Sequence, residues 1–427
     1  MNQTIYPKLG ETLWRTTLEN GLKICVAQRK GFTGKTAYLV TKYGSIHREF
    51  TLDGVAYTTP AGVAHYLEHK MFDLPGRDVT AEFAALGASP NAFTAYDMTA
   101  YYFSCTDSFF QSLKLLLEFV STPYFTEETV EKERGIIEQE ILMYADSPES
   151  QVVEDLMEAV YAAHPIADPI AGTVQSIARI TPQILELCHR AFYAPANMML
   201  CVAGDVDPEQ VAALAEQVLP KGRRSVGIPR FGREPAEVNR PLTRRKMDVA
   251  MPTFQMGFKC PAGLTGKAFA HWELMAELAA EALFGESSAL YLRLYEQGLI
   301  DSSFGGYVET VDGAAMLTCG GDSDDPQAVM DAVIEEARRL AQEGIGQTEF
   351  SRMKKSLMGG KIKGLDSLES TCFRLCAYET MGFDYFRFPE CFAELEAEEV
   401  RVFLRDHIRR ENCAAAIVDP LELKEDI

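Results

Sequence analysis

The stretch VAHYLEHKMF at residues 63–72 places two histidines and a glutamate where they could act together. His65 and His69 are four residues apart, so on a helix both imidazoles share one face, with Glu68 beside them. The neighbouring side chains are apolar, and Pro-Ala-Gly just before them is a plausible helix entry. An H-x-x-E-H pattern arises by chance in on the order of one in a hundred shuffled sequences. A catalytic zinc site also needs a third protein ligand.

A second acidic segment, EETVEKERGIIEQEILMY at residues 127–144, offers candidates for that ligand. Residues seven apart on a helix are separated by only about 20° around its axis. Glu133 and Glu140 therefore form one pair on a common face, and Glu131 and Glu138 form another. Helical geometry alone leaves both pairs open.

The elements that must position these residues read as a mixture of strands and helices. Residues 22–28, 36–45 and 99–106 are rich in β-branched and aromatic residues and predict strands, while the acidic segment and several others predict helices. This order favours an α+β fold in which helices pack on one face of a sheet.

The chain also repeats itself with a period near 210 residues. The segments 180–208 and 396–420 both read as a helix, a buried strand and an Asp-Pro turn, and their Asp-Pro pairs are 212 residues apart. The same offset aligns HYLEHKMF at 65–72 with ELAAEALF at 277–284, and a similar one aligns EQE at 138–140 with MGG at 358–360. Periods of this length indicate a duplicated domain.

The repeat predicts an N-terminal metal-bearing domain over 1–220, a linker over 221–247 and a homologous C-terminal domain over 248–427. The linker is rich in Pro, Gly and Arg in a chain whose net charge is −21. We expect it to lie on the acidic body, since no aromatic interleaving supports a nucleic-acid arm. The second half carries none of the candidate ligands, because the matching positions are Glu277, Ala280, Glu281 and Gly360.

Composition narrows the function classes. The 427 residues exceed what one ordinary core accommodates, and the strong negative charge disfavours binding to nucleic acid or to an anionic membrane. No N-terminal signal sequence and no membrane span are predicted. The ten cysteines are scattered through apolar segments, which favours reduced core thiols and a cytoplasmic protein.

The motifs AHYLEH and ERGIIEQEILMYADSP resemble those of the insulinase/pitrilysin metallopeptidases, whose zinc motif reverses the commoner H-E-x-x-H order. The resemblance extends over nearly the whole chain and includes LENGLKI, GASPNAFTAYDMTAYYF and HPIADPIAGT. It is strongest to the bacterial YfmH-type proteins, which are associated with modification of elongation factor P. It implies two homologous domains, each with a mixed, mostly antiparallel sheet, that form half of a clam-like chamber.

The resemblance also assigns roles. His65, His69 and Glu140 become ligands of one Zn²⁺ ion, Glu68 becomes the general base that activates the attacking water, and Glu133 becomes a partner that orients the site. It makes residues 87–103 an edge strand where an extended peptide adds by backbone pairing. The expected substrate contacts are Asn91, Ala92, Phe93 and Thr94.

One departure from the family pattern concerns the second half. Related peptidases carry an Arg and a Tyr there that contact substrate, and the corresponding segment of this chain, 288–306, places Tyr295 and Asp301 at those positions. Arg293 is nearby but out of register, and Tyr307 could compensate. The resemblance therefore implies a zinc endopeptidase whose site is completed by a homologous partner subunit, or by a second copy in a homodimer. The alternative is a non-proteolytic scaffold or chaperone-like subunit of the elongation factor P pathway.

Overall fold

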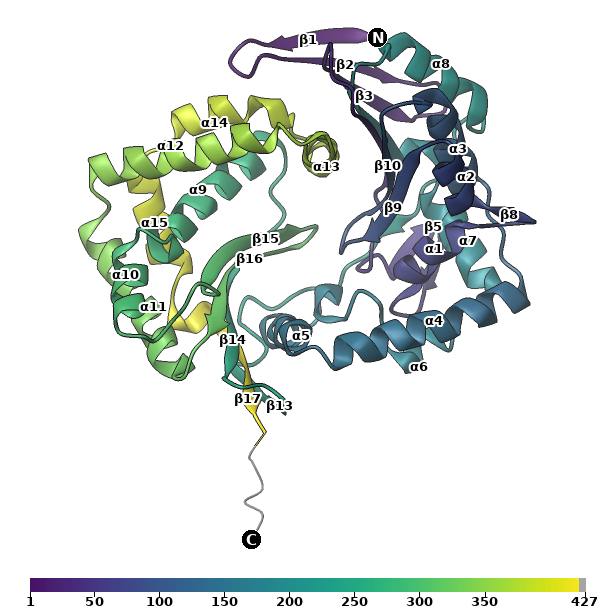
Figure 1. Cartoon of the computed structure of the whole chain (residues 1–427). Helices are drawn as coiled ribbons and strands as arrows, with labels where there is room; N and C mark the ends of the chain where they lie inside the picture. The colour runs from purple at the N-terminus through teal and green to yellow at the C-terminus, as the bar shows by residue number, and fades with distance from the viewer. Residues whose placement is uncertain (422–427) are drawn as a thin grey trace. The chain divides into compact units, whose positions relative to one another are not determined.

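The computed structural model describes residues 1–421 and divides the chain into two compact units (Figure 1). The first unit comprises residues 1–141, 169–230 and 361–387, and the second comprises the described residues within 142–168, 231–360 and 388–427. Two of the points at which the chain passes from one unit to the other lie inside long helices, α4 (Glu127–Ala145) and α12 (Gln347–Gly364).

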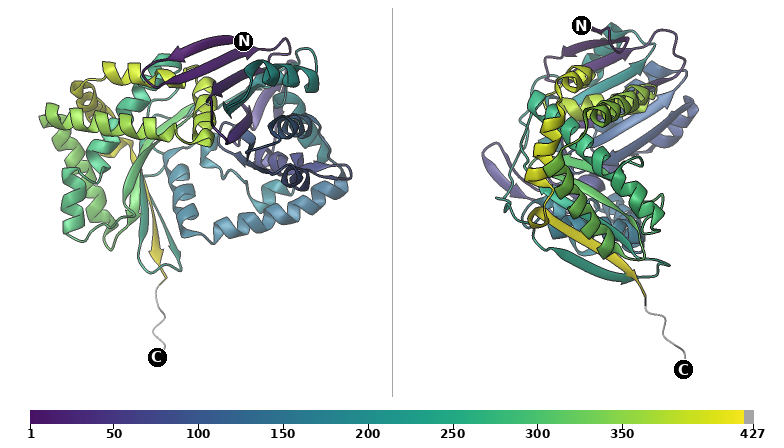
Figure 2. Two further views of the ribbon diagram at one scale, coloured as in Figure 1. Left: turned by 45° about the horizontal axis from the view of Figure 1, so that its top comes forward. Right: turned by 90° about the vertical axis from the view of Figure 1, so that its left-hand side faces the viewer.

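A mixed sheet forms the centre of the first unit, and Figure 2 shows it from two further directions, with the purple N-terminal strands at one border. All neighbouring strands are antiparallel except for the parallel pair β3 and β11. Within the described residues, the strand order across the sheet is β1 (Asn2–Tyr6), β2 (Glu11–Thr17), β3 (Lys23–Gln28), β11 (Met198–Gly204), β4 (Lys35–Thr41), β10 (Thr99–Cys105) and β9 (Ala88–Thr94).

Two small sheets and a set of helices complete the first unit. The small sheets are β12 (Ile228–Pro229), β5 (Glu49–Leu52) and β6 (Val55–Thr58), and the pair β7 (Asp73–Leu74) and β8 (Arg77–Asp78). Besides α4, the helices are α1 (Val63–Met71), α2 (Val79–Ala85), α3 (Phe109–Ser121), α6 (Val174–Ile177), α7 (Pro182–Phe192), α8 (Pro208–Val218) and α13 (Leu368–Thr380).

The two faces of the first sheet are covered by helices from different parts of the sequence. Side chains alternate along a strand, and Leu200 and Val202 join the apolar core formed with the helices α1, α3 and α8. Cys201, between them, instead meets Cys372 and Cys376 of α13 on the opposite face. Helix α13 comes from the second half of the chain, so that half completes the first unit's packing.

The second unit has the same sheet topology in shortened form. Among the described residues, its strand order is β13 (Leu242–Met247), β17 (Cys413–Pro420), β14 (Thr253–Cys260), β16 (Ala314–Asp322) and β15 (Gly305–Val311), with only the first pair parallel. Its helices are α5 (Pro148–Val160), α9 (Gly266–Phe284), α10 (Ala289–Glu296), α11 (Pro326–Glu343), α14 (Phe388–Glu394) and α15 (Ala397–His407), together with most of α12. This order matches β3, β11, β4, β10 and β9 of the first unit, which confirms the predicted α+β fold and its duplication.

The contiguous domain boundaries predicted from the repeat need correction, because each half of the chain gives one helix to the other unit. Helix α5 follows the first-half helix α4 but packs on β14 and β17, where Gly257 lets Leu156 and Val160 approach closely. Helix α13 follows α12 and packs on β4 and β11. Residues 422–427 of the predicted C-terminal domain lie outside the described residues.

The predicted linker at 221–247 is also more structured than expected. Its last residues form β13, an internal part of the second unit's fold. Its basic side chains pair with acidic residues of the units to which they belong, as in Arg230 with Glu49 and Arg245 with Asp155. These ion pairs neutralise acidic side chains next to the segment.

Two further features bear on the expectations about membrane spans and cysteines. No helix within residues 1–421 is long and apolar enough to cross a membrane. The ten cysteines all fall in this range as free thiols, and nine of them are buried.

Candidate metal centre

Helix α1 is fixed at its start by a close backbone approach. It begins after Gly62, which has a φ of 87° and lies so near the Ala171 carbonyl that a Cβ atom would come within 2.3 Å of that oxygen. The Ser176 hydroxyl donates a hydrogen bond of 2.8 Å to the Ala61 carbonyl. Glycine is thus required at the entry predicted from the sequence, and the first turn of the helix is anchored to residues 171–176.

Two buried side chains tie α1 to α4. The Tyr66 hydroxyl donates to the Val130 carbonyl, and the Lys70 ammonium donates to Asp73 and, at 3.3 Å, to the Thr129 carbonyl. Lys70 is completely buried, and a buried ammonium is tolerated only when it is paired and hydrogen-bonded. These contacts hold the first turn of α4 against α1.

Helix α4 brings two of its carboxylates to the α1 histidines. Glu133 Oε1 lies 3.0 Å from His69 Nδ1, while Glu140 lies 3.5 Å from His65 Nε2 and 3.4 Å from His69 Nε2. Glu131 instead forms an ion pair with Arg134 and is exposed. The structure therefore selects the Glu133 and Glu140 pair, which sequence geometry had left open against Glu131 and Glu138.

The arrangement of these atoms fits a bound zinc ion. Within residues 1–421, His65, His69 and Glu140 form a group able to hold a metal, with ligand atoms all within 4.8 Å of one another. Around a tetrahedral zinc with bonds of about 2.0–2.1 Å, two ligand atoms lie roughly 3.3 Å apart. The separations of 3.5 Å from His65 Nε2 to Glu140 Oε1 and of 3.4 Å from His69 Nε2 to Glu140 Oε2 are close to that value, each histidine facing a different oxygen of the carboxylate. Glu133 at Nδ1 of His69 would fix the tautomer that leaves Nε2 free for the metal.

The electrostatics of the metal-free site show how strongly these groups interact. Burial lowers the pKa of His69, but hydrogen bonds to Glu133 and Glu140 outweigh it and raise that pKa to about 10. Hydrogen bonds to His65 and His69 hold the pKa of Glu140 well below its usual range. Glu140 is therefore ionised, as a zinc ligand must be, whereas His69 holds a proton between the two glutamates that it must release when Nε2 binds a metal.

Glu68 is held differently from the candidate ligands. Its side chain is buried beside the two histidines, and this burial raises its pKa above the ordinary value for a glutamate. Its Oε2 atom accepts a hydrogen bond of 2.7 Å from the Thr94 hydroxyl. A carboxylate with a raised pKa, adjacent to a candidate metal position, has the properties of a general base.

Strand β9 carries the four predicted substrate contacts and borders the sheet. It pairs with β10 only, so its other side is an open edge among the described residues. Ala95 N–H donates to the Met98 carbonyl at 2.8 Å, which by alternation turns the backbone groups of Ala92 and Thr94 away from β10. The Asn91 side chain accepts from the Ala92 N–H at 2.8 Å.

The remaining substrate candidate, Phe93, lies on the α13 side of β9. Its ring is 6.3 Å from that of Tyr102 and 5.8 Å from that of Phe373 in α13. Sequence reasoning missed Phe373, because nothing local connects it with β9. It also missed Tyr66 and Lys70, although both lie inside the histidine motif, where a buried lysine was a usable signal.

The second unit contains no equivalent centre within the described residues. The positions matching the α1 motif lie in the last two turns of α9, and Gly360 lies in α12. Arg293 of α10 lies 3.6 Å from Glu336 in α11, while Tyr295 and Tyr307 are largely exposed.

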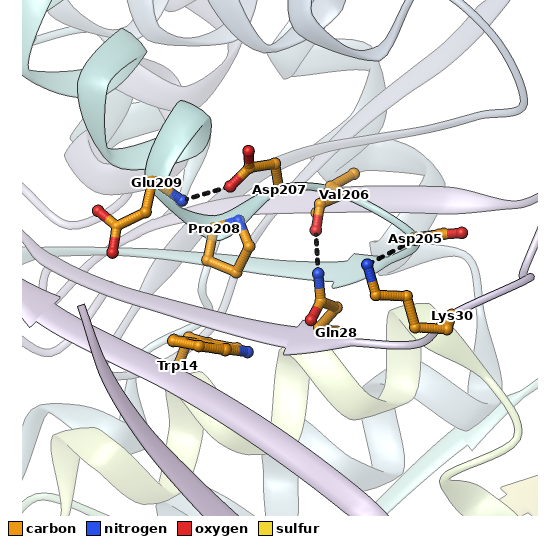
Figure 3. A pocket seen from close by; sticks show the side chains of 8 residues that line it. All are labelled: Trp14, Gln28, Lys30, Asp205, Val206, Asp207, Pro208 and Glu209. Atoms are coloured by element: carbon orange, nitrogen blue, oxygen red, sulfur yellow. Dashed lines mark hydrogen bonds and ion pairs between the residues drawn. The ribbon is translucent and has the colours of Figure 1, made fainter.

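A separate pocket of about 460 Å³ in the first unit is shown in Figure 3, where β3 meets the turn that begins α8. Its polar groups already satisfy one another: Gln28 donates to the Val206 carbonyl at 2.9 Å, and Asp207 caps α8 by accepting from Glu209 N–H at 2.9 Å. It is lined by Trp14, Gln28, Lys30, Asp205, Val206, Asp207, Pro208 and Glu209, a set without histidine or cysteine.

Comparison with known proteins accords with this geometry. Residues 39–174 match the family model described as insulinase (peptidase family M16), and residues 179–357 match the one described as the peptidase M16 inactive domain. The chain is 35% identical over 424 residues to the uncharacterized zinc protease YmfH of Bacillus subtilis, covering 97% of this chain and 98% of that protein. An uncharacterized zinc protease of Mycobacterium tuberculosis is 27% identical, with coverage of 95% and 93%.

Solved structures give the same result. An M16-like peptidase from Alicyclobacillus acidocaldarius superimposes with a TM-score of 0.93 at 32% identity, covering 96% of this chain and 99% of that one. A protease from Helicobacter pylori shares the fold, with a TM-score of 0.84 at 19% identity and coverage of 96% and 99%. The chain therefore belongs to the insulinase, or M16, family of zinc metallopeptidases.

Proposed function

We propose that this chain is a zinc-dependent endopeptidase that hydrolyses peptides or unfolded polypeptide segments. The observation that supports it most directly is the position of Glu68, a buried carboxylate held beside His65, His69 and Glu140 by a side chain of an open edge strand. A structural zinc site usually closes with four protein ligands and has no use for an additional carboxylate of this kind.

His65, His69 and Glu140 would hold the zinc ion, which supplies a Lewis acid for the scissile carbonyl and for water. Glu68 accepts the proton of the attacking water and returns it to the leaving amine. Strand β9 orients the substrate by pairing with its backbone through Ala92 and Thr94, an interaction suited to extended chains with no folded structure of their own. Glu133 keeps His69 in the orientation that the metal requires.

A fluorogenic, unstructured peptide library tests this proposal. The zinc-loaded chain should cleave internal bonds, lose that activity with a chelator and recover it when zinc is restored. Mass spectrometry of the products locates the cleaved bonds. Bonds cleaved far from both ends of the peptide identify an endopeptidase, and removal of terminal residues identifies an exopeptidase. A chain that binds zinc stoichiometrically but cleaves none of the peptides, alone or together with a homologous chain, would instead support the scaffold alternative.

We further propose that full activity needs a homologous partner chain that supplies an Arg and a Tyr. In support, Tyr295 and Asp301 occupy the positions at which related peptidases carry that pair, and Arg293 is engaged with the buried Glu336. Adding a homologous chain that carries the Arg-Tyr segment should raise kcat/KM for the peptide library by at least tenfold. Full activity of the lone chain at concentrations where it is monomeric would contradict this.

A further inference from the structure

We propose that Thr94 is a positioning residue that couples the peptide-binding edge of β9 to the orientation of Glu68. This inference rests on the proposed peptidase function and revises the simpler expectation that Thr94 only contacts substrate. Thr94 contacts both parts of the site: its side chain donates a hydrogen bond to Glu68, and its backbone lies at the open edge of the sheet.

The side-chain contact orients the carboxylate. Within residues 1–421, the Thr94 hydroxyl is the hydrogen-bond donor to Glu68, and it binds Oε2 at 2.7 Å. Oε1 is thereby left for the proton transfer that a general base performs. A glutamate side chain has three rotatable bonds, so one charge-assisted hydrogen bond at its end favours one carboxylate orientation over the others.

Thr94 is itself supported from the core of the first unit. Its hydroxyl lies 3.4 Å from that of Thr99, the residue opposite it on β10. Thr99 is completely buried and donates to the Tyr43 carbonyl at 2.8 Å. Each hydroxyl has one hydrogen, and these are donated to Glu68 and to the Tyr43 carbonyl, so the contact between the two threonines is a packing contact that holds Thr94 against a buried residue of the sheet.

The backbone of Thr94 connects the substrate to this hydrogen bond. Because Ala95 N–H bonds to the Met98 carbonyl, the pairing alternates so that Thr94 and Ala92 direct their backbone groups to the open edge. A peptide that adds to this edge would order the backbone of Thr94. The same event would fix the hydroxyl that holds Glu68, so binding energy from the substrate backbone is used to orient the base.

The test compares Thr94→Val, which keeps the shape and removes the hydroxyl, with Thr94→Ser, which keeps the hydroxyl. Thr36→Val is the matched control, because Thr36 is a buried threonine in the same sheet whose hydroxyl donates to the Phe103 carbonyl, away from Glu68. Zinc content, KM and kcat for an unstructured peptide would be measured for the four zinc-loaded chains.

Thr94→Val should lower kcat by about 10- to 100-fold, the effect of losing one hydrogen bond to a charged group. KM and zinc content should stay within about twofold of wild type. Thr94→Ser should restore most of kcat, and Thr36→Val should leave it unchanged. A Thr94→Val protein with wild-type kcat, or one in which only KM rises, would overturn the proposal.

Crystal structures of the zinc-loaded wild type, Thr94→Val and Thr94→Ser give a readout that does not depend on activity. The Glu68 carboxylate should adopt one orientation in the wild type and in Thr94→Ser, and several orientations or a different one in Thr94→Val. An unchanged single orientation in Thr94→Val would refute the positioning role. A wild type that cleaves nothing even with a homologous partner chain would refute the peptidase function instead, and the crystal structures would still decide about Thr94.

Discussion

Helix α1 and the last two turns of α9 are the same element in two copies, and within the described residues only α1 carries candidate metal ligands. The apolar positions persist, since Met71 and Phe72 correspond to Leu283 and Phe284, all four of them apolar. The polar positions do not persist: His65, Tyr66, Glu68, His69 and Lys70 correspond to Glu277, Leu278, Ala280, Glu281 and Ala282.

This difference separates what the fold needs from what function needs. The second unit builds the same strand order around a helix with Leu and Ala where α1 has Tyr, Glu and Lys. Placing a carboxylate and an ammonium in a protein interior costs free energy unless each is paired. Since the copy in α9 folds without them, Glu68 and Lys70 are explained by the candidate metal centre: Glu68 lies beside its histidines, and Lys70 holds α4, which carries Glu140, against α1.

The largest effect on zinc binding and activity, the properties in which the two units are expected to differ, should come from removing a metal ligand. Glu140→Gln should abolish stoichiometric zinc binding and all peptide cleavage, because a neutral amide replaces the one anionic ligand. Glu138→Gln on the same helix is the control and should retain one zinc per chain. Metal analysis of the dialysed proteins measures the number of zinc ions per chain. A second zinc ion in the wild type would contradict the view that the second unit has no metal site.

The next effect separates metal binding from catalysis. Glu68→Gln should keep one zinc per chain while kcat falls by about 10²- to 10⁴-fold, the usual contribution of a general base. Glu281→Gln, at the position matching His69 in the second unit, should leave both quantities unchanged. If Glu68→Gln cleaves peptides at the wild-type rate, Glu68 is not the base.

A smaller effect concerns the partner of His69. Glu133→Gln should weaken zinc affinity by about 10- to 100-fold, as expected when the residue that orients a ligating histidine is altered. Competition with a chromophoric chelator measures this. Glu131→Gln, whose carboxylate faces Arg134 on the exposed side, should not change the affinity, and equal losses in both variants would point to a general effect of charge on α4.

A change in stability, and not in zinc binding or catalysis, is expected at another position that differs between the repeats. His189 is buried in α7, and its burial lowers its pKa to about 4, whereas its counterpart Arg401 is partly exposed on α15. The unfolded chain binds this proton near pH 6.5, so stability is lost as pH falls from 6.5 through 4, by about 3 kcal/mol in total. His189→Gln should flatten this acid limb in denaturant titrations, and Arg401→Gln should leave it as in the wild type.

Much of the candidate centre could be predicted from local sequence, because helical spacing fixes which side chains share a face. His65, Glu68 and His69 follow from one turn of helix, and the seven-residue repeat narrows the third ligand to two pairs. Choosing Glu140 required knowing which face of α4 meets α1, a tertiary contact made through Tyr66 and Lys70.

Other features had no local signal at all. The bond from Thr94 to Glu68 depends on the register of β9 against β10 and on how α1 packs across it. The exchange of α5 and α13 was missed because each is an ordinary amphipathic helix following α4 or α12. Nothing in its residues says which sheet it will cover.

That exchange has a consequence for biosynthesis. The face of the first sheet that receives α13 stays uncovered until residues 368–380 have left the ribosome, long after its last strand, β11, has been made. During synthesis, Cys201 and its neighbours on this face of the nascent N-terminal half are therefore exposed to water. They are also accessible to chaperones and to incorrect association. A proteolytic or genetic cut between the halves would leave two fragments that each lack one helix of their sheet's packing.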